Sequence, residues 1–258
     1  MNYHGAIFDV DGVLVDTPHE MAWRESLERL MTGEWLQVAP HTRYSAAAFT
    51  TAVYQEQLAG KPRAAGAQAA FDYFGIVDPD GTRIQQYMTQ KQAMIEELIE
   101  RGEFTVFPDA LRFLLRLKEH GLKLAAASSS QNANKFLSKI DVGAFVAGGG
   151  MEGETLSFAL PETLTMLDMF DANVCGHPFP QGKPAPDIFL GAAAAIPLPP
   201  SQCFVVEDAS SGVAAARAGG MYAIGVARLN DEALLQAAGA DRVVVNLDAV
   251  DVGALLGA

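Results

Sequence analysis

The chain contains 258 residues, half of them hydrophobic, so it can bury a substantial core as one large domain or two small ones. Its 31 acidic and 18 basic residues give a formal net charge of −13 at pH 7, and this charge, with no basic stripe, argues against nucleic acid and anionic membrane surfaces as partners. Two cysteines, Cys175 and Cys203, and the lack of a membrane-length apolar run favour a cytoplasmic protein without a disulfide framework.

The first predicted element is a buried strand over residues 5–8, which ends in Asp9-Val10-Asp11-Gly12. Side chains at i and i+2 of an extended chain point to the same face, so the two carboxylates should lie close together. A bound cation such as Mg²⁺ would relieve their repulsion. An ordinary turn with Gly12 at positive φ is the alternative. An EF-hand loop is excluded, because its other ligands do not follow at the required spacing.

The region that follows the first acid pair is predicted to be helical. Apolar residues recur there at helical spacing, and no convincing strand interrupts the pattern. The predicted helical stretches are 20–30, 46–58 and 84–99. We therefore predict a helical cap domain over 17–103, inserted into a core domain made of 1–16 and 104–258.

After Pro108, short apolar runs alternate with helical segments, a pattern typical of a parallel sheet covered on both faces. The predicted strands are 123–127, 172–175, 203–206, 222–226 and 242–245. The predicted helices are 110–120, 132–139, 187–196 and 213–218. These elements predict an α/β fold with a doubly wound, Rossmann-like parallel sheet. The less regular stretch 144–180 contains neither a phosphate-binding loop nor a repeat.

Polar residues follow several of these strands, at the edge where open parallel sheets bind ligands. Residues 128–132 could bind an anion at a helix start, or could only cap the helix. Lys183 lies in a proline-containing loop, where a lone lysine is usually solvated. Glu207 and Asp208 form a second acid pair, which could also be a helix cap. Because all of them occupy one edge of one sheet, together they predict a functional site.

In these places the sequence resembles the haloacid dehalogenase superfamily of phosphotransferases. Four segments match its motifs in order, namely FDVDGVLVDT, the serine of LAAAS, GKPAPDIF and VVEDASSGVAAARAGG. The resemblance covers nearly the whole predicted core. The helical insert after the first motif resembles the cap of the β-phosphoglucomutase-like subgroup.

The resemblance implies roles in phosphoryl transfer for five residues. Asp9 would be the nucleophile that forms an aspartyl-phosphate, and Asp11 would be the general acid and then the general base. Ser128, the backbone N–H of Ser129 and Lys183 would hold the oxygens of the transferring phosphoryl group.

The resemblance also implies a Mg²⁺ site between the two acid pairs. The Asp9 carboxylate, the backbone carbonyl of Asp11 and the Asp208 carboxylate would be its ligands. Glu207 would be either a further ligand or an acid next to the ligands. The cation would let an anionic nucleophile approach an anionic phosphate.

In the resembling subgroup the cap selects the substrate, and three residues here match its positions. Gly60-Lys61-Pro62-Arg63 matches a motif whose arginine contacts the substrate, and Lys91 falls near a second basic cap position. Both could instead be ordinary solvated helix charges. His19 would correspond to a cap-hinge histidine if two residues are deleted after Thr17; otherwise it is a solvated hinge residue.

Residues near the second motif bear on the choice between two reactions. Ser130 and Asn132 match positions that contact the second phosphate in the mutases, whereas Gln131 stands where those enzymes carry lysine. This departure favours a phosphatase. The segments 35–44 and 141–181 lie outside the family pattern, and the sequence predicts no role for them.

The sequence therefore predicts a Mg²⁺-dependent sugar-phosphate phosphatase, with a β-phosphoglucomutase-type mutase as the alternative. A metal-free dehalogenase would not need Asp11 together with Glu207 and Asp208, and a non-catalytic binding protein would not need all four motifs. The expected partner is a small phosphorylated substrate, and the expected state is a monomer or a weak homodimer. The identity of the sugar does not follow from the sequence.

Overall fold

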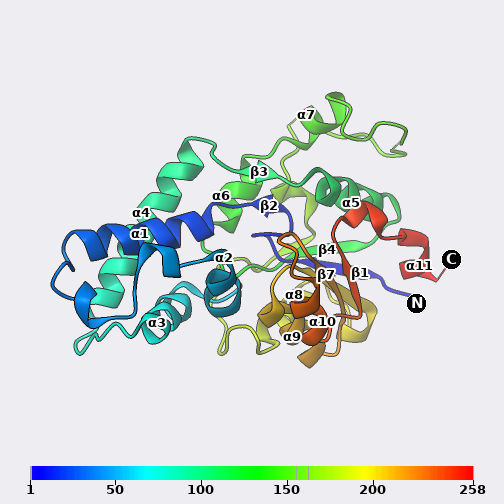
Figure 1. Ribbon diagram of the computed structural model, residues 1–258. Helices are drawn as coiled ribbons and strands as arrows, with labels where there is room; N and C mark the ends of the chain where they lie inside the picture. Colours follow the sequence, from blue (N-terminus) through cyan, green and yellow to red (C-terminus); the bar gives the residue numbers. More distant parts are fainter. Residues whose placement is uncertain (1, 155, 162, 258) are drawn as a thin grey trace. The chain divides into compact units, whose positions relative to one another are not determined.

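The structure is a computed structural model that describes residues 2–154, 156–161 and 163–257. The chain divides into two compact units, one made of Met1–Asp16 with Thr105–Ala258 and the other of Thr17–Phe104 (Figure 1). They are called the core unit and the cap unit below.

The core unit is built on a six-stranded sheet with the strand order β5-β4-β1-β6-β7-β8. Every neighbouring pair in this sheet is parallel. The strands are β1 (Gly5–Phe8), β4 (Lys123–Ala126), β5 (Ala172–Asn173), β6 (Cys203–Glu207), β7 (Tyr222–Val226) and β8 (Arg242–Val244). β1 lies between β4 and β6, so the residues that follow these three strands share the middle of one edge. The predicted doubly wound fold is confirmed.

Helices cover both faces of this sheet, because alternate strand residues point to opposite sides. Ile7 and Val205 pack in one cluster with α8 and α9, whereas Phe8 packs edge-on against Phe113 of α5, with ring centroids 6.1 Å apart. Figure 1 shows α8, α9 and α10 on one side of the strands and α5 on the other. The helices of the core unit are α5 (Pro108–Glu119), α6 (Ala133–Ser138), α7 (Val142–Ala147), α8 (Asp187–Ala195), α9 (Ser210–Ala218), α10 (Glu232–Ala237) and α11 (Val252–Leu256).

A short antiparallel pair lies where the chain leaves the core unit and returns to it. β2 (Val15–Asp16) pairs with β3 (Thr105–Val106). Two-residue strands carry too little alternation to be recognised in a sequence, and neither was predicted. The pair ties the turn after Asp11 to the segment that begins α5.

The cap unit is helical and has its own aromatic core. Its helices are α1 (His19–Thr32), α2 (Thr51–Val53), α3 (Arg63–Phe74) and α4 (Thr82–Glu100). Trp23 meets Tyr87 edge-on with ring centroids 5.1 Å apart, and the Tyr87 hydroxyl donates a hydrogen bond of 2.8 Å to the backbone carbonyl of Trp23. The ring of Phe71 stacks on Tyr87 at 6.0 Å, so α1, α3 and α4 share one core.

Two parts of the cap unit differ from the sequence prediction. The predicted helix 46–58 is broken, because Ser45 and Thr50 each cap a new helical start. Helix α3 was not predicted, since its alanines and Gly66 give no clear apolar stripe. A methyl group at Gly66 would lie 3.4 Å from the Trp23 ring, so the small residues of α3 allow it to approach α1 closely.

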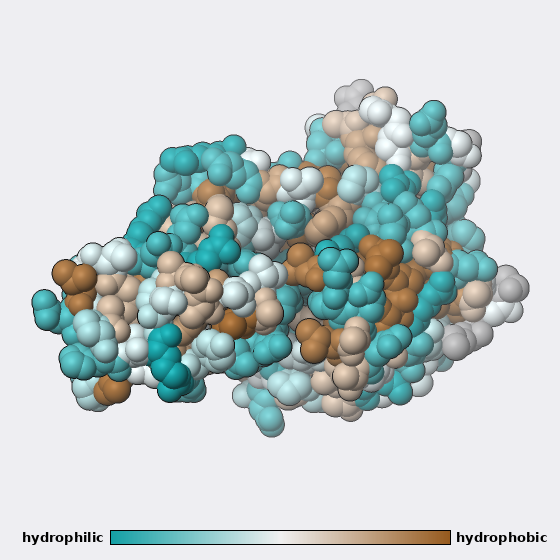
Figure 2. Space-filling model, in the orientation of Figure 1, coloured by the Kyte–Doolittle hydropathy of each residue, from teal (hydrophilic) through white to brown (hydrophobic). Residues whose placement is uncertain are grey.

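The surface in Figure 2 is a mixture of hydrophilic residues and separate hydrophobic patches. The large apolar side chains that are exposed in the described part of the chain are Leu36, Tyr73, Val77, Leu190, Leu229, Leu234 and Val245. Among the described residues, no helix has both the length and the apolarity that a membrane span requires.

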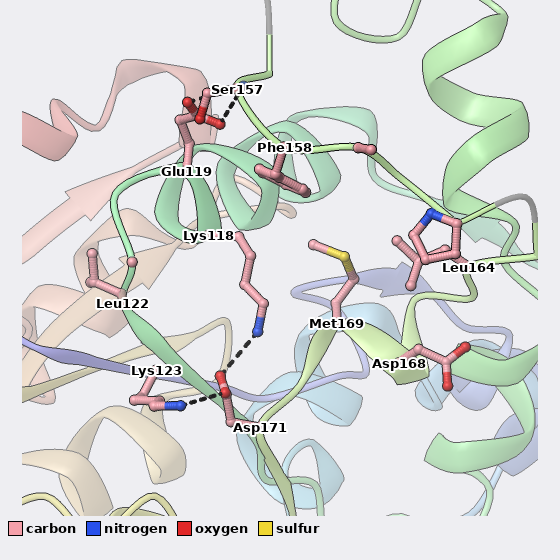
Figure 3. A pocket seen from close by; sticks show the side chains of 13 residues that line it. Lys118, Glu119, Leu122, Lys123, Ser157, Phe158, Leu164, Asp168, Met169 and Asp171 are labelled. Atoms are coloured by element: carbon pink, nitrogen blue, oxygen red, sulfur yellow. Dashed lines mark hydrogen bonds and ion pairs between the residues drawn. The ribbon is translucent and has the colours of Figure 1, made fainter.

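A pocket of about 490 Å³ lies in the core unit, partly walled by the segment 141–181. Lys118 and Lys123 both point toward Asp171 in this pocket, with Nζ–O distances of 3.0 and 2.9 Å (Figure 3). Asp171 precedes β5 and Lys123 begins β4, so the pocket lies at the amino ends of these strands. It is therefore separate from the edge that carries the family motifs.

Candidate active site

Asp9 and Lys183 form a buried ion pair at the carboxyl end of β1. Asp9 directly follows the strand and donates its backbone N–H to the Val206 carbonyl at 3.1 Å, which continues the pairing with β6. Lys183 comes from the loop before α8, and its Nζ lies 2.6 Å from Asp9 Oδ1. The side chains of Asp9 and Lys183 are 7% and 0% exposed, so the attraction acts in a medium that screens it poorly.

Glu207 holds the other side of the Lys183 ammonium. Its Oε1 accepts a hydrogen bond from Nζ, and its Oε2 accepts the backbone N–H of Ala209 at 2.8 Å. A methyl group at Gly212 would lie 1.7 Å from Oε1, so the carboxylate rests on the start of α9. Burial lowers the pKa of Lys183, but the charges of Asp9 and Glu207 outweigh it and raise the net pKa. This arrangement supports an orienting role for Glu207 rather than the role of a metal ligand.

Asp11 and Ser128 meet on the other side of Asp9. The Ser128 hydroxyl donates a hydrogen bond of 3.0 Å to Asp11 Oδ2 and accepts the backbone N–H of Ser130 at 3.0 Å. The backbone N–H of Asn132 donates to Ser130 Oγ at 3.2 Å, which folds the segment after β4 into a tight loop. Ser129 lies within this loop. The predicted anion loop and the predicted acid–base residue are thus neighbours.

Cys175 is a site residue that the sequence analysis did not identify. Its Sγ accepts the backbone N–H of Ser128 at 3.3 Å, and burial raises the pKa of the thiol to about 12. The uncharged thiol therefore holds the start of the predicted anion loop 128–132 from the segment after β5. Its place just after β5, at the same edge of the sheet, was the signal that could have identified it.

The two acid pairs offer oxygen ligands that suit a hard divalent cation. Among the described residues, no three acidic, histidine or cysteine side chains converge as a ready metal site. Mg²⁺, however, usually takes one or two carboxylates and completes its shell with carbonyls, water and substrate. Burial raises the pKa of Asp9 to about 7 despite Lys183, with Glu207 and Asp11 adding to the rise. Burial and the charges of Glu207 and Asp9 also raise the pKa of Asp208. A cation between Asp9 and Asp208 would offset this unfavourable charge, so the residues fit the ion.

Gly12 brings Asp208 close to the backbone of the first motif. Gly12 has a φ of +83°, and a methyl group there would lie 1.9 Å from Asp208 Oδ2. We expect Gly12→Ala to displace Asp208, and to cost about 1–2 kcal/mol of stability from the backbone strain alone. Gly220→Ala is the matched control, since Gly220 has a φ of +73° and open space around it. Urea denaturation and initial rates should show that only Gly12→Ala loses activity as well as stability. Equal activity in both variants would contradict this placement of Asp208.

The predicted substrate residues of the cap unit form two local groups. His19 Nδ1 lies 3.3 Å from Lys91 Nζ, and this ammonium also lies 5.0 Å from the centre of the Trp23 ring. Lys91 and His19 are only 4% and 8% exposed, so the solvated alternatives for them are wrong. Arg63, at the start of α3, donates to the side chain of Gln92, which in turn donates to Glu96 at 2.8 Å.

The parallel sheet, the acid pairs at its carboxyl edge and the helical unit inserted after β1 define a class of doubly wound α/β proteins with a helical cap and an acidic site. The family model of the haloacid dehalogenase-like hydrolases matches residues 3–220, and the chain belongs to this family.

Two relatives and one solved structure resemble this chain over most of its length. The β-phosphoglucomutase of Bacillus subtilis is 30% identical over 85% of this chain and 81% of its own length. The fructose-1-phosphate phosphatase YqaB of Escherichia coli is also 30% identical, over 87% of this chain and 96% of its own. The crystal structure of a β-phosphoglucomutase from a hyperthermophilic Pyrococcus matches with a TM-score of 0.65 at 29% identity, over 98% and 97% of the two chains. The chain is thus an enzyme of the phosphatase or phosphomutase type, as the sequence predicted.

Proposed function

We propose that the protein is a Mg²⁺-dependent phosphatase that acts on a sugar phosphate through an aspartyl-phosphate on Asp9. The observation that carries the proposal is the buried pair of Asp9 and Lys183, with 2.6 Å between Oδ1 and Nζ, beside Ser128 and Asp11. Lys183 can neutralise negative charge at the point where a phosphoryl group would meet the nucleophile. An ion pair that only stabilised the fold would not need the acid and the anion loop around it.

The proposed reaction has two steps. In the first, an Asp9 oxygen attacks phosphorus, the bond to the leaving oxygen breaks, and Asp11 gives that oxygen its proton. In the second, Asp11 takes a proton from water, the water oxygen attacks phosphorus, and Asp9 leaves as a carboxylate. Ser128, the Ser129 N–H and Lys183 bind the phosphoryl oxygens throughout. Bound Mg²⁺, held by Asp9, the Asp11 carbonyl and Asp208, would reduce the repulsion between carboxylate and phosphate.

A phosphatase is preferred over a mutase because of one residue. A mutase must bind a sugar bisphosphate in two orientations and so needs a second clamp for phosphate. Ser130, Asn132 and Arg63 could contribute to such a clamp, but Gln131 supplies an amide where the mutases have a positive charge. The relatives named above include both a mutase and a sugar phosphatase. A cytoplasmic location and a monomer or weak homodimer remain predictions.

A screen of phosphorylated metabolites with Mg²⁺ tests the proposal, provided that it follows two products. Phosphate release should dominate with one or more sugar phosphates. β-Glucose 1-phosphate with a trace of the bisphosphate should yield free phosphate and little glucose 6-phosphate. Efficient isomerisation with negligible phosphate release would identify a mutase instead. No reaction with any phosphate ester would reject both.

The cap arginine provides a second test. If Arg63 binds the part of the substrate remote from the reacting phosphate, Arg63→Ala should cost on the order of 2–5 kcal/mol in transition-state binding for a sugar phosphate. Hydrolysis of a small phosphate ester should be nearly unchanged. Lys61→Ala is the control, because the Lys61 ammonium of the same loop binds the backbone carbonyl of Gln57. Ratios of kcat/KM for the two substrates measure the effect, and an equal loss for both would contradict the role of Arg63.

A further inference from the structure

The turn after Asp11 is held by a residue that lies outside the four motifs. Within the turn, Gly12 N–H donates to the Val15 carbonyl at 2.8 Å and Leu14 N–H donates to the Val10 carbonyl at 2.9 Å. The carbonyl of Val13 instead accepts a hydrogen bond of 3.3 Å from Nη2 of Arg228. Val13 is fully buried, so its carbonyl needs a donor from the protein.

The guanidinium of Arg228 is itself held on two further sides. Nη1 and Nη2 donate to the two oxygens of Asp109 at 2.9 and 3.2 Å. The guanidinium carbon lies 4.0 Å from the centre of the Phe107 ring. Asp109 is 4% exposed, and its Oδ2 also accepts the backbone N–H of Leu247 at 2.8 Å. A forked, stacked arginine in this setting has little freedom, so it fixes the position of the carbonyl that it binds.

Phe107, which stacks on Arg228, also makes its own contact with the turn. Phe107 donates its backbone N–H to the Leu14 carbonyl at 3.0 Å. Arg228 and Phe107 therefore contact two successive carbonyls of the turn, and Asp109 holds Arg228 in place. We call these three residues the arginine bracket. Asp9 depends on it less, because the pairing of β1 with β6 and the Lys183 ion pair hold Asp9 independently.

We propose that Arg228, held by Asp109, is a positioning residue which, through the Val13 carbonyl, fixes the carboxylate of Asp11. This inference rests on the proposed function, in which Asp11 donates the proton to the leaving group. A general acid works only within hydrogen-bond reach of that oxygen, and a displacement of about 1 Å can cost roughly 10²-fold in rate. Loss of the bracket should therefore slow proton donation far more than nucleophilic attack by Asp9.

Two aryl phosphates of similar size separate these effects. The leaving oxygen of phenyl phosphate needs a proton, whereas p-nitrophenolate leaves without one. In single-turnover experiments, Arg228→Lys should slow phenol release by about 10- to 100-fold and p-nitrophenolate release by less than about threefold. Asp109→Asn, a milder change that keeps the arginine, should shift the ratio in the same direction. If Arg228→Lys does not fold, the ratio of the two rates in Asp109→Asn tests the proposal instead.

Arg217→Lys is the matched control. Arg217 also pairs with an aspartate, Asp241, and also donates to a backbone carbonyl, that of Met221 at 3.2 Å, but it does so at the amino end of β7. Arg217→Lys should lower the melting temperature without changing the ratio of phenol release to p-nitrophenolate release. If the bracket variants release phenol and p-nitrophenolate equally slowly, or as fast as the wild type, the positioning role of the bracket is overturned. Activity of the wild type would still uphold the proposed function. Wild-type protein that releases neither phenol nor p-nitrophenolate, and no phosphate from any sugar phosphate, would overturn both.

Discussion

Asp9→Asn is expected to lower the rate of phosphoryl transfer by roughly 10⁴- to 10⁶-fold, the range found when one member of a catalytic triad is removed. The amide has nearly the volume of the carboxylate, and its oxygen can still accept the hydrogen bond from Lys183, which keeps Glu207 as its counter-ion. The variant should therefore fold but should form no covalent phosphoenzyme. Initial rates and the intact mass of acid-quenched protein measure the two results.

The same substitution at Asp16 provides the control for this experiment. Asp16 is exposed on β2, seven positions further along the first motif segment. Asp16→Asn should keep both the activity and the phosphoenzyme of the wild type. Full activity in Asp9→Asn, with a normal circular dichroism spectrum, would reject Asp9 as the nucleophile and with it the proposed reaction.

The meeting of the candidate site residues at one edge of the sheet could be predicted because its signals are local. Asp9 and Asp11 follow a four-residue buried strand, and in a parallel sheet the residues after each strand meet at one edge. Lys183 and Glu207 come after different elements, but the same rule places them there. The sequence did not reveal which partner Glu207 would take. That choice depends on the close approach of Gly212 and the Ala209 N–H, which are features of the folded backbone.

Other features could not be predicted, because they join segments far apart in the chain. Arg228 binds the carbonyl of Val13, and nothing near either residue in the sequence indicates the other. For Lys91, a candidate substrate residue, the sequence leaves a solvated charge as the alternative, because lysine is rarely buried. In the structure, Lys91 is buried, with Trp23 of α1 and the His19 ring against its ammonium. Propensity rules cannot anticipate such tertiary contacts.

Removal of the metal is expected to abolish turnover, and Mg²⁺ should restore it. Asp9 and Asp208 carry raised pKa values because burial and like charge disfavour their ionised forms. A divalent cation would relieve this repulsion and let the phosphate approach, an effect of several kcal/mol that corresponds to a loss on the order of 10³-fold in excess chelator. Undiminished activity in excess chelator would favour the metal-free chemistry of a dehalogenase.

Binding of the ion can be measured without turnover, by its effect on unfolding. A ligand that binds only the folded state at about 100 times its Kd stabilises the protein by about 2.7 kcal/mol, which raises the melting temperature. We expect Mg²⁺ to produce this rise in the wild type and not in Asp208→Asn, which loses a charged oxygen ligand. Asp241→Asn is the control, because Asp241 pairs with Arg217 at the opposite edge of the sheet and its loss should lower stability without removing the Mg²⁺ response. An undiminished rise in Asp208→Asn would show that the ion binds elsewhere, and the site between the two acid pairs would then have to be abandoned.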